Sequence, residues 1–254
     1  MRGRLGQVGK NWNDVLGEVN QTESPFDRVR RQYLRELHEY TNRNIIAYYS
    51  GWLQKPSAEH AYVCSINDDD KNGFMACCHG IRPELGLDLL LHSPGGDVAA
   101  TESIIHYLRS KFQADIRVIV PQISMSGGTM IACCGYEIIM GRQSNLGPID
   151  PQMGGRWPAI AVINEFERAF EEIKEQPEKI AVWRPILEQY SPTFLSTCEN
   201  AIKWSKTIGK EALIRGMFKD IHDREDRADR VIERLIRAVS GRRESRGIPK
   251  GLIL

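Results

Sequence analysis

The sequence predicts an α/β fold in which a mainly parallel sheet has flanking helices and is followed by a helical C-terminal region. Two observations lead to this prediction. Short apolar runs typical of buried strands alternate with helical patterns over residues 44–152, with short links between them. Beyond Gln152, apolar residues recur at helical spacing. The 254 residues, 41% hydrophobic and 26% charged, suffice for one domain with an ample core.

Residues 1–43 are expected to form an N-terminal arm and a helix. The stretch to Glu23 has no clear periodicity, so we expect it to wrap the surface or a neighbouring subunit. Pro25 then stands where a helix start tolerates proline. Apolar side chains follow at helical spacing: Phe26, Val29, Tyr33, Leu34, Leu37 and Tyr40.

The first part of the core, from residue 44, is expected to contain two buried strands. Asn44–Tyr49 and Ala61–Ile66 are the apolar runs that predict them. Asp68–Asp70 and the Asn72-Gly73 pair predict a turn that leads into a short helix.

Two strand–turn–helix units complete the core to residue 152. In the first, the strand Leu87–Leu91 precedes a helix over Val98–Phe112, for which Asp97 is a natural N-cap. In the second, the strand Ile116–Val120 precedes a short helix through Ala132. A further strand is predicted over Tyr136–Met140.

Residues 153–254 are expected to be a helical region of the same domain. Pro192–Ile208 is one predicted helix. The charges over Arg224–Arg230 alternate in sign, which favours a solvated helix face over a nucleic-acid patch. Two other helices are indicated by apolar stripes: Ile160, Ile163, Phe166, Phe170 and Ile173 in one, and Val231, Ile232, Leu235 and Val239 in the other.

Composition excludes several classes of protein. A formal net charge of +1 argues against a dedicated nucleic-acid or membrane-surface protein. No run approaches the ~20 apolar residues that span a bilayer, and Met1–Lys10 lacks the apolar region of a secretory signal. We therefore expect a cytoplasmic protein without a membrane anchor.

The six cysteines do not have the spacing of a metal site. They include two vicinal pairs and no C-x-x-C motif, so no zinc or other metal is expected. Cys77 and Cys133 stand in predicted helices among Met, Ala and Phe, which is typical of small core residues in a reducing compartment.

Two glycine turns carry the functional signal. His92-Ser-Pro-Gly-Gly-Asp97 and Ser124-Met-Ser-Gly-Gly128 each close a predicted strand and open a helix. Ligand sites of parallel sheets lie at such strand ends, and glycine pairs let backbone N–H groups approach a ligand closely. Ser126 adds a hydroxyl, so the turns together offer a nucleophile and an oxyanion hole for acyl transfer.

These motifs carry a family resemblance. Ser-Pro-Gly-Gly resembles the oxyanion loop of the Clp protease proteolytic subunit, and Ser-Gly-Gly-Thr-Met-Ile-Ala resembles the nucleophile turn of signal peptide peptidase A. With Leu146-Gly-Pro-Ile-Asp-Pro-Gln152, the set is most similar to the serine dehydrogenase proteinase family of the Clp/crotonase superfamily. The resemblance covers residues 44–152 and implies a Clp/crotonase-like fold, a serine endopeptidase and a homo-oligomer.

The resemblance also implies roles for individual residues. Ser126 is the nucleophile, and the backbone N–H groups of Gly96 and Gly127 are the oxyanion donors. The family's order Ser, Asp, His makes Asp150 the acid that orients a histidine. His222 is the one histidine after Asp150 and is therefore the expected general base.

Each of these residues also has a purely structural interpretation. Ser126 could cap a helix, and the two glycines could serve only as turns. Asp150 could be a turn residue before proline, and His222 a surface residue in a linking loop. His92 and Lys174 are weaker candidates for the base: His92 ends a buried strand, and Lys174 follows an apolar stripe.

Two other functions stay open. A crotonase-type enzyme would use the same paired N–H groups to polarise an acyl-CoA thioester, although that chemistry does not need the Ser126 hydroxyl. A catalytically silent scaffold would use its helices only for assembly. The leading hypothesis is a peptidase that acts on peptide or protein substrates, with no nucleic-acid partner and no cofactor.

Overall fold

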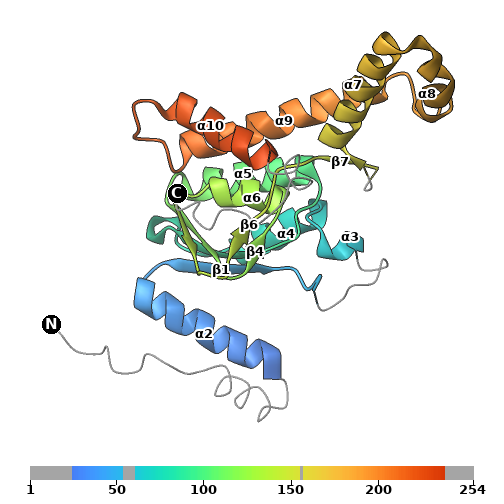
Figure 1. Cartoon of the computed structure of the whole chain (residues 1–254). Coiled ribbons are helices and arrows are strands. Elements are labelled where there is room, and N and C mark those ends of the chain that lie inside the picture. The colour runs from blue at the N-terminus through green and yellow to red at the C-terminus, as the bar shows by residue number, and fades with distance from the viewer. Residues whose placement is uncertain (1–24, 54–60, 155–156, 238–254) are drawn as a thin grey trace.

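The computed structural model describes residues 25–53, 61–154 and 157–237, and it confirms the α/β fold (Figure 1). Its centre is a four-stranded sheet in the order β1-β2-β3-β5, parallel throughout. These strands match four of the five predicted strands: β1 (Asn44–Tyr49), β2 (Leu87–His92), β3 (Ile116–Val120) and β5 (Glu137–Met140).

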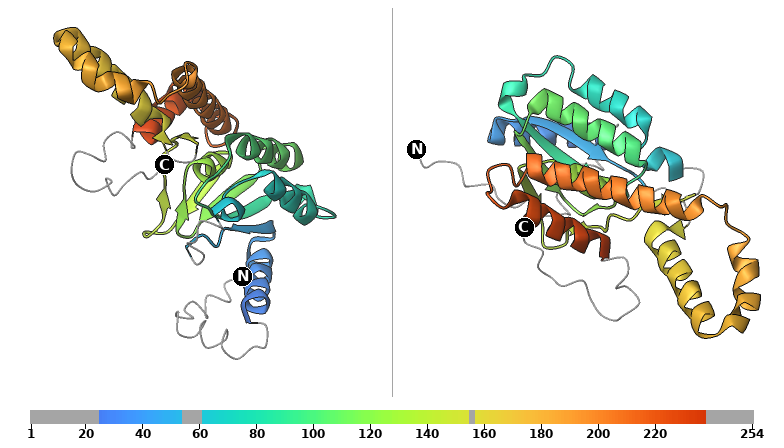
Figure 2. Two further views of the ribbon diagram at one scale, coloured as in Figure 1. Left: turned by 90° about the vertical axis from the view of Figure 1, so that its right-hand side faces the viewer. Right: turned by 90° about the horizontal axis from the view of Figure 1, so that it is seen from above.

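Helices α4 (Asp68–Cys77), α5 (Val98–Phe112) and α6 (Gly127–Cys133) cover one face of the sheet (Figures 1 and 2). Because side chains alternate along a strand, Leu89 and Leu91 of β2 point to this face and are fully buried. Asp97 caps α5, as predicted, by accepting the backbone N–H of Ala100. The covered face therefore holds the main core.

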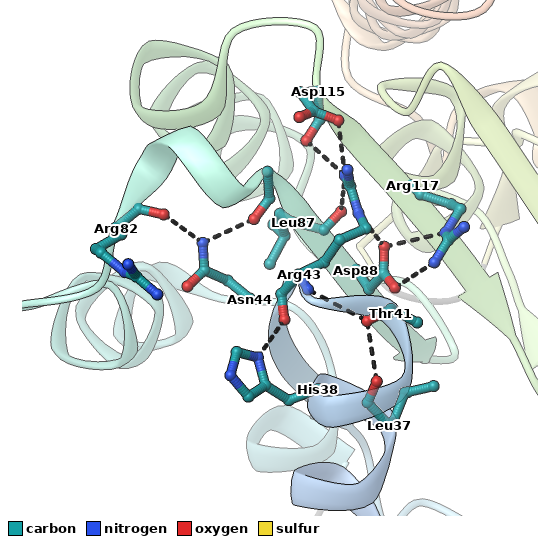
Figure 3. A network of polar contacts seen from close by, with 11 residues as sticks. Leu37, His38, Thr41, Arg43, Asn44, Arg82, Leu87, Asp88, Asp115 and Arg117 are labelled. Atoms are coloured by element: carbon teal, nitrogen blue, oxygen red, sulfur yellow. Dashed lines mark hydrogen bonds and ion pairs between the residues drawn. The ribbon is translucent and has the colours of Figure 1, made fainter. Parts of the chain in front are cut away.

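The opposite face carries a buried ionic network around Asp88 (Figure 3). Asp88 has no exposed surface, and its carboxylate accepts Arg43 Nε at 2.6 Å and Arg117 Nη2 at 2.5 Å. Arg43 also pairs with Asp115 at 2.8 Å. Two arginines compensate the burial of one carboxylate, and they join the start of β1 to β2 and β3.

Helix α2 (Pro25–Thr41) stands away from the sheet on its open side (Figure 2). The predicted helix is confirmed, and its end is fixed to β1 where His38 Nδ1 and the Arg43 carbonyl lie 2.7 Å apart. Val29 is buried, whereas Tyr40, predicted to share its face, is 88% exposed. The predicted arm to Glu23 and the Phe26 side chain lie outside the described residues.

The predicted strand Ala61–Ile66 is wrong. Ala61–Cys64 forms the short helix α3, and within this stretch Ile66 alone makes a bridge, to Gly96. The chain turns at Asn67, whose side chain accepts the N–H of Asp69 in a capping box. That cap commits the following residues to a helix, so Ile66 contributes a single point of pairing.

The predicted turn at Asp68–Asp70 is also wrong, because these residues form the first turn of α4. Carboxylates are favourable there, since they face the positive end of a helix. Asn72 and Gly73 lie inside α4. The helix tolerates them because its buried contact is made by Phe74.

The C-terminal region is helical, as predicted. Its helices are α7 (Ala159–Glu175), α8 (Ile180–Leu187), α9 (Phe194–Arg215) and α10 (Arg224–Arg237). Helices α9 and α10 lie over the core, whereas α7 and α8 project from it (Figures 1 and 2). Phe170, a member of the predicted α7 stripe, is 65% exposed. Val239 lies outside the described residues.

The cysteines divide by burial. Cys133 is buried as predicted, but Cys77 is exposed, because its neighbour Cys78 points into the core instead. Burial raises the thiol pKa to about 12 for Cys133 and to about 11 for Cys134, so neither is a nucleophile at neutral pH. Among the described helices, none has the length and apolar character that crossing a membrane requires.

Candidate active site

Ser126 occupies a tight turn between the two-residue strand β4 (Ile123–Ser124) and helix α6. Its φ of 49° and ψ of −116° are uncommon for a residue with a side chain. Such backbone strain persists where the surroundings enforce it, and it is frequent at catalytic residues. The side chain is half-buried and can be reached from solvent.

The first glycine turn lies directly against Ser126. Gly95 has a φ of +92°, and a Cβ added to it would lie 2.7 Å from Ser126 Cβ and 3.1 Å from the Gly127 nitrogen. Only glycine permits both this φ and this approach. The two glycine turns singled out in the sequence are therefore in contact, and the absence of a side chain at Gly95 makes the contact possible.

The backbone around Gly96 is almost fully hydrogen-bonded. The Gly95 carbonyl accepts the Ile66 N–H at 2.9 Å, and the Asp97 N–H donates to the Ile66 carbonyl at 2.8 Å. Among the hydrogen bonds of the described residues, none is donated by the N–H groups of Gly96 and Gly127. These two N–H groups belong to the predicted oxyanion donors, and neither has a hydrogen-bond partner within the part of the chain that the structure describes.

The motif Leu146–Gln152 flanks the nucleophile turn. Leu146 ends strand β6 (Asn145–Leu146), which pairs with β4. The next residue, Gly147, donates its N–H to the Ser124 carbonyl at 2.8 Å. A Cβ on Gly147 would lie 3.0 Å from Met125 Cα, so this segment packs on the residue before Ser126.

Asp150 follows on the same segment and is buried, with 6% exposure. Its Oδ2 accepts Gln152 Nε2 at 3.1 Å, and the backbone N–H of Ile160 also donates to the carboxylate. Oδ1 is buried without a hydrogen-bond partner. Burial raises the pKa of Asp150, because the charged form is poorly solvated. Asp150 thus binds the start of α7 and keeps one free oxygen.

His222 does not join Asp150. It is exposed in the connection between α9 and α10, just before α10 begins at Arg224. Ile149, next to Asp150, donates instead to the carbonyl of Leu235 near the other end of α10. At about 1.5 Å per residue, Arg224 and Leu235 are roughly 16 Å apart along the helix. No hydrogen bond joins Asp150 to His222 among those of the described residues.

The weaker candidates lie elsewhere too. His92 is buried with its Nε2 3.2 Å from Gln122 Oε1, and its ring stacks on Tyr49 at 4.5 Å. By strand alternation it points to the same face as Asp88, whereas α6 lies on the other. Lys174 is exposed on α7 and pairs with Glu171 at 4.0 Å.

Sequence reasoning missed three residues that shape the site: Ile66, Ser93 and Thr101. Ser93 Oγ accepts the Gly95 N–H at 3.1 Å, and Thr101 Oγ1 donates to the Asp97 carbonyl at 2.7 Å. Thr101 had a signal, since a threonine can bond the carbonyl four residues earlier in a helix. Ile66 had none, because its partner is distant in sequence.

The described residues contain no cluster of three or more His, Cys, Asp or Glu side chains suited to a metal ion. The chemical groups that the site does bring together are a serine hydroxyl, backbone amides and a buried carboxylate.

Comparison with known proteins agrees with the motifs. Two uncharacterized proteins of Methanocaldococcus jannaschii, MJ1495 and MJ0137, are each 37% identical to this chain, over 111 and 103 residues. Those stretches cover 44% and 41% of this chain, but only 37% and 35% of the relatives. Residues 27–186 match the family of ClpP-like SDH-type serine proteinases. The chain belongs to the ClpP-like SDH-type serine proteinase family.

Proposed function

We propose that this protein is a serine endopeptidase that cleaves peptide or protein substrates through an acyl-enzyme on Ser126. The observation that carries the proposal is the contact of Gly95 with Ser126, beside two backbone N–H groups that bond nothing among the described residues. A nucleophile next to a pair of free amide donors is the arrangement that acyl transfer requires.

The reaction begins when Ser126 Oγ gives its proton to Asp150, the proposed base, and attacks the carbonyl carbon of the scissile bond. The new C–O bond pushes the carbonyl electrons onto oxygen, and Gly96 and Gly127 donate their N–H groups to that oxyanion. Collapse of the intermediate breaks the C–N bond and releases the amine, which takes up the proton that Asp150 removed from Ser126. A water molecule then cleaves the ester of Ser126 by the same route in reverse.

Asp150 is the proton-transfer group that the geometry favours. Of the four residues considered for this role, it is the one on the segment that packs against Met125, whereas His92, Lys174 and His222 lie elsewhere. A buried carboxyl group with a free oxygen, whose pKa burial raises above its ordinary value, can accept and return a proton. This role replaces the orienting role that the family order suggested.

The proposal is tested by labelling with a fluorophosphonate probe and by casein turnover. We expect both in the native chain and neither in Ser126→Ala, which removes only a hydroxyl. Ser124→Ala is the matched control, since Ser124 is fully buried and its Oγ bonds nothing. Labelling that survives Ser126→Ala and is lost in Ser124→Ala would overturn the assignment. Turnover of acyl-CoA esters without labelling would favour the crotonase-type alternative, and a native chain inactive in every assay would favour a scaffold.

We also propose that the chain forms a homo-oligomer. The sheet face opposite α5 and α6 carries the exposed side chains of Tyr49 and Ile139, and parallel sheets are ordinarily covered on both faces. Light scattering at micromolar concentration should give a mass well above the 28.9 kDa of one chain. A mass equal to that of one chain would refute this part of the proposal.

A further inference from the structure

Four hydroxyl side chains without exposed surface surround the contact between the two glycine turns: Ser93, Thr101, Ser124 and Thr129. Burying a hydroxyl is unfavourable unless it is hydrogen-bonded. Thr129 Oγ1 donates to the Ser124 carbonyl at 2.8 Å and so fixes the nucleophile turn. Ser93 and Thr101 bond the backbone on either side of Gly96. Ser124 Oγ is the member without a partner.

Ser93 acts at the point that sets the direction of the Gly96 N–H. A trans peptide is planar, so the Gly95 carbonyl and the Gly96 N–H point in opposite directions. The Gly95 carbonyl is held by Ile66, and the Gly95 N–H is held by Ser93 Oγ at 3.1 Å. Both peptide planes of Gly95 are thereby fixed, and with them its φ of +92°.

We propose that Ser93 is a positioning residue of the oxyanion loop, whose hydroxyl holds Gly95 so that the Gly96 N–H meets the reacting carbonyl oxygen. This inference rests on the proposed peptidase function. It assigns Ser93 a role that neither the glycine motif nor the family resemblance assigned. Ser93 touches no reacting atom and acts through Gly95 and Gly96.

The surroundings of Ser93 explain why its oxygen serves as an acceptor. Burial and the neighbouring Asp70 raise the pKa of the Tyr48 phenol, and a hydrogen bond with Ser93 acts in the opposite direction. The Gly95 N–H can only donate, so Ser93 Oγ is the acceptor of their 3.1 Å hydrogen bond whichever way its own proton points. Tyr48 is itself held against Phe74, with ring centroids 5.3 Å apart.

The test compares Ser93→Ala with Ser124→Ala. The two serines pair with each other in a parallel bridge and are equally buried, but only Ser93 Oγ binds the oxyanion loop. We expect Ser93→Ala to lower kcat on the order of 10–100-fold with KM changed less than about threefold, because an oxyanion donor acts mainly in the transition state. Ser124→Ala should keep the native kcat, since it removes a hydroxyl that bonds nothing.

Ser93→Cys serves as a second variant in case Ser93→Ala does not fold. It keeps the shape of the side chain and replaces the oxygen by sulfur, which is a weaker hydrogen-bond acceptor. Its kcat should fall between those of the native chain and Ser93→Ala. Equal kcat in Ser93→Ala, Ser93→Cys and Ser124→Ala would overturn the positioning role while the peptidase function stands. A rise in KM with unchanged kcat would also overturn it. A native chain that is neither labelled nor active would refute the proposed function, and the positioning role with it.

Discussion

Gly95→Ala perturbs the contact between the two glycine turns. The new methyl group would lie 2.7 Å from the Met125 carbonyl oxygen and from Ser126 Cβ, and 3.1 Å from the Gly127 nitrogen. All of these atoms are at or next to the backbone, so the loop itself must move. The φ of +92° adds strain for any residue with a Cβ. The loop should therefore shift away from Ser126.

The expected magnitude has two parts. The positive φ contributes about 1–2 kcal/mol, and overpacking contributes about 1–3 kcal/mol, so the free energy of unfolding should fall by about 2–5 kcal/mol. Moving the Gly96 N–H should lower kcat on the order of 10²–10³-fold. Gly80→Ala is the matched control, since Gly80 has a φ of +73° but no atom within 4 Å of an added Cβ.

Urea unfolding and steady-state peptidase kinetics measure both effects. Gly80→Ala should lose only the strain of positive φ, about 1–2 kcal/mol, and keep the native kcat. The difference between the two variants then isolates the contact with the nucleophile turn. If Gly95→Ala matched Gly80→Ala in both stability and kcat, the described contact of the two glycine turns would be refuted.

Three further predictions concern the ionic network, the buried carboxyl and the oxyanion loop. Asp88→Asn leaves the buried ends of two arginines without this carboxylate and should lower the free energy of unfolding by about 3 kcal/mol in urea; an unchanged value would contradict the network's role. The raised pKa of Asp150 destabilises its ionised form, so stability should fall as pH rises from 3.8 through the folded-state pKa. Asp150→Asn should abolish that fall and stabilise the neutral-pH protein while lowering kcat, and a thermal melt less stable than native would contradict it. Gly96→Val would drive Cβ into the backbone nitrogen and oxygen of Ile66 and should lower kcat on the order of 10²–10³-fold; native kinetics would refute the loop's role.

The sheet and most helices could be predicted because their signals are local. The strands β1, β2, β3 and β5 are short apolar runs, and Asp97 is a cap adjacent to the helix it starts. The failure at Ala61–Ile66 has a physical reason. Residues 61–64 form a helical turn because the Asn67 capping box and the bridge from Ile66 to Gly96 constrain the chain beside them. The periodicity of the sequence around Ile66 cannot indicate that it pairs with Gly96, which is thirty residues away.

The residues of the candidate site also divide into those that a local sequence motif identifies and those that it does not. Ser126, Gly96 and Gly127 could be named because glycine turns and a hydroxyl leave a compact sequence pattern. Ser93 stands in the Ser-Pro-Gly-Gly motif and Thr101 stands in a predicted helix, but the sequence does not report which backbone atoms their hydroxyl groups bond. His222 was chosen because it follows Asp150 in the sequence. The order of residues could not indicate that Ile149, next to Asp150, bonds Leu235, whereas His222 precedes the other end of α10.

The most direct test of the central claim is to identify the labelled residue. After reaction of the native chain with a fluorophosphonate, digestion and mass spectrometry should place the adduct on Ser126 alone. Gly95→Ala should slow the labelling, whereas Gly80→Ala should not, because only the first alters the contact with Ser126. An adduct on another residue, or no adduct on the folded native chain, would contradict the assignment of Ser126 as the nucleophile.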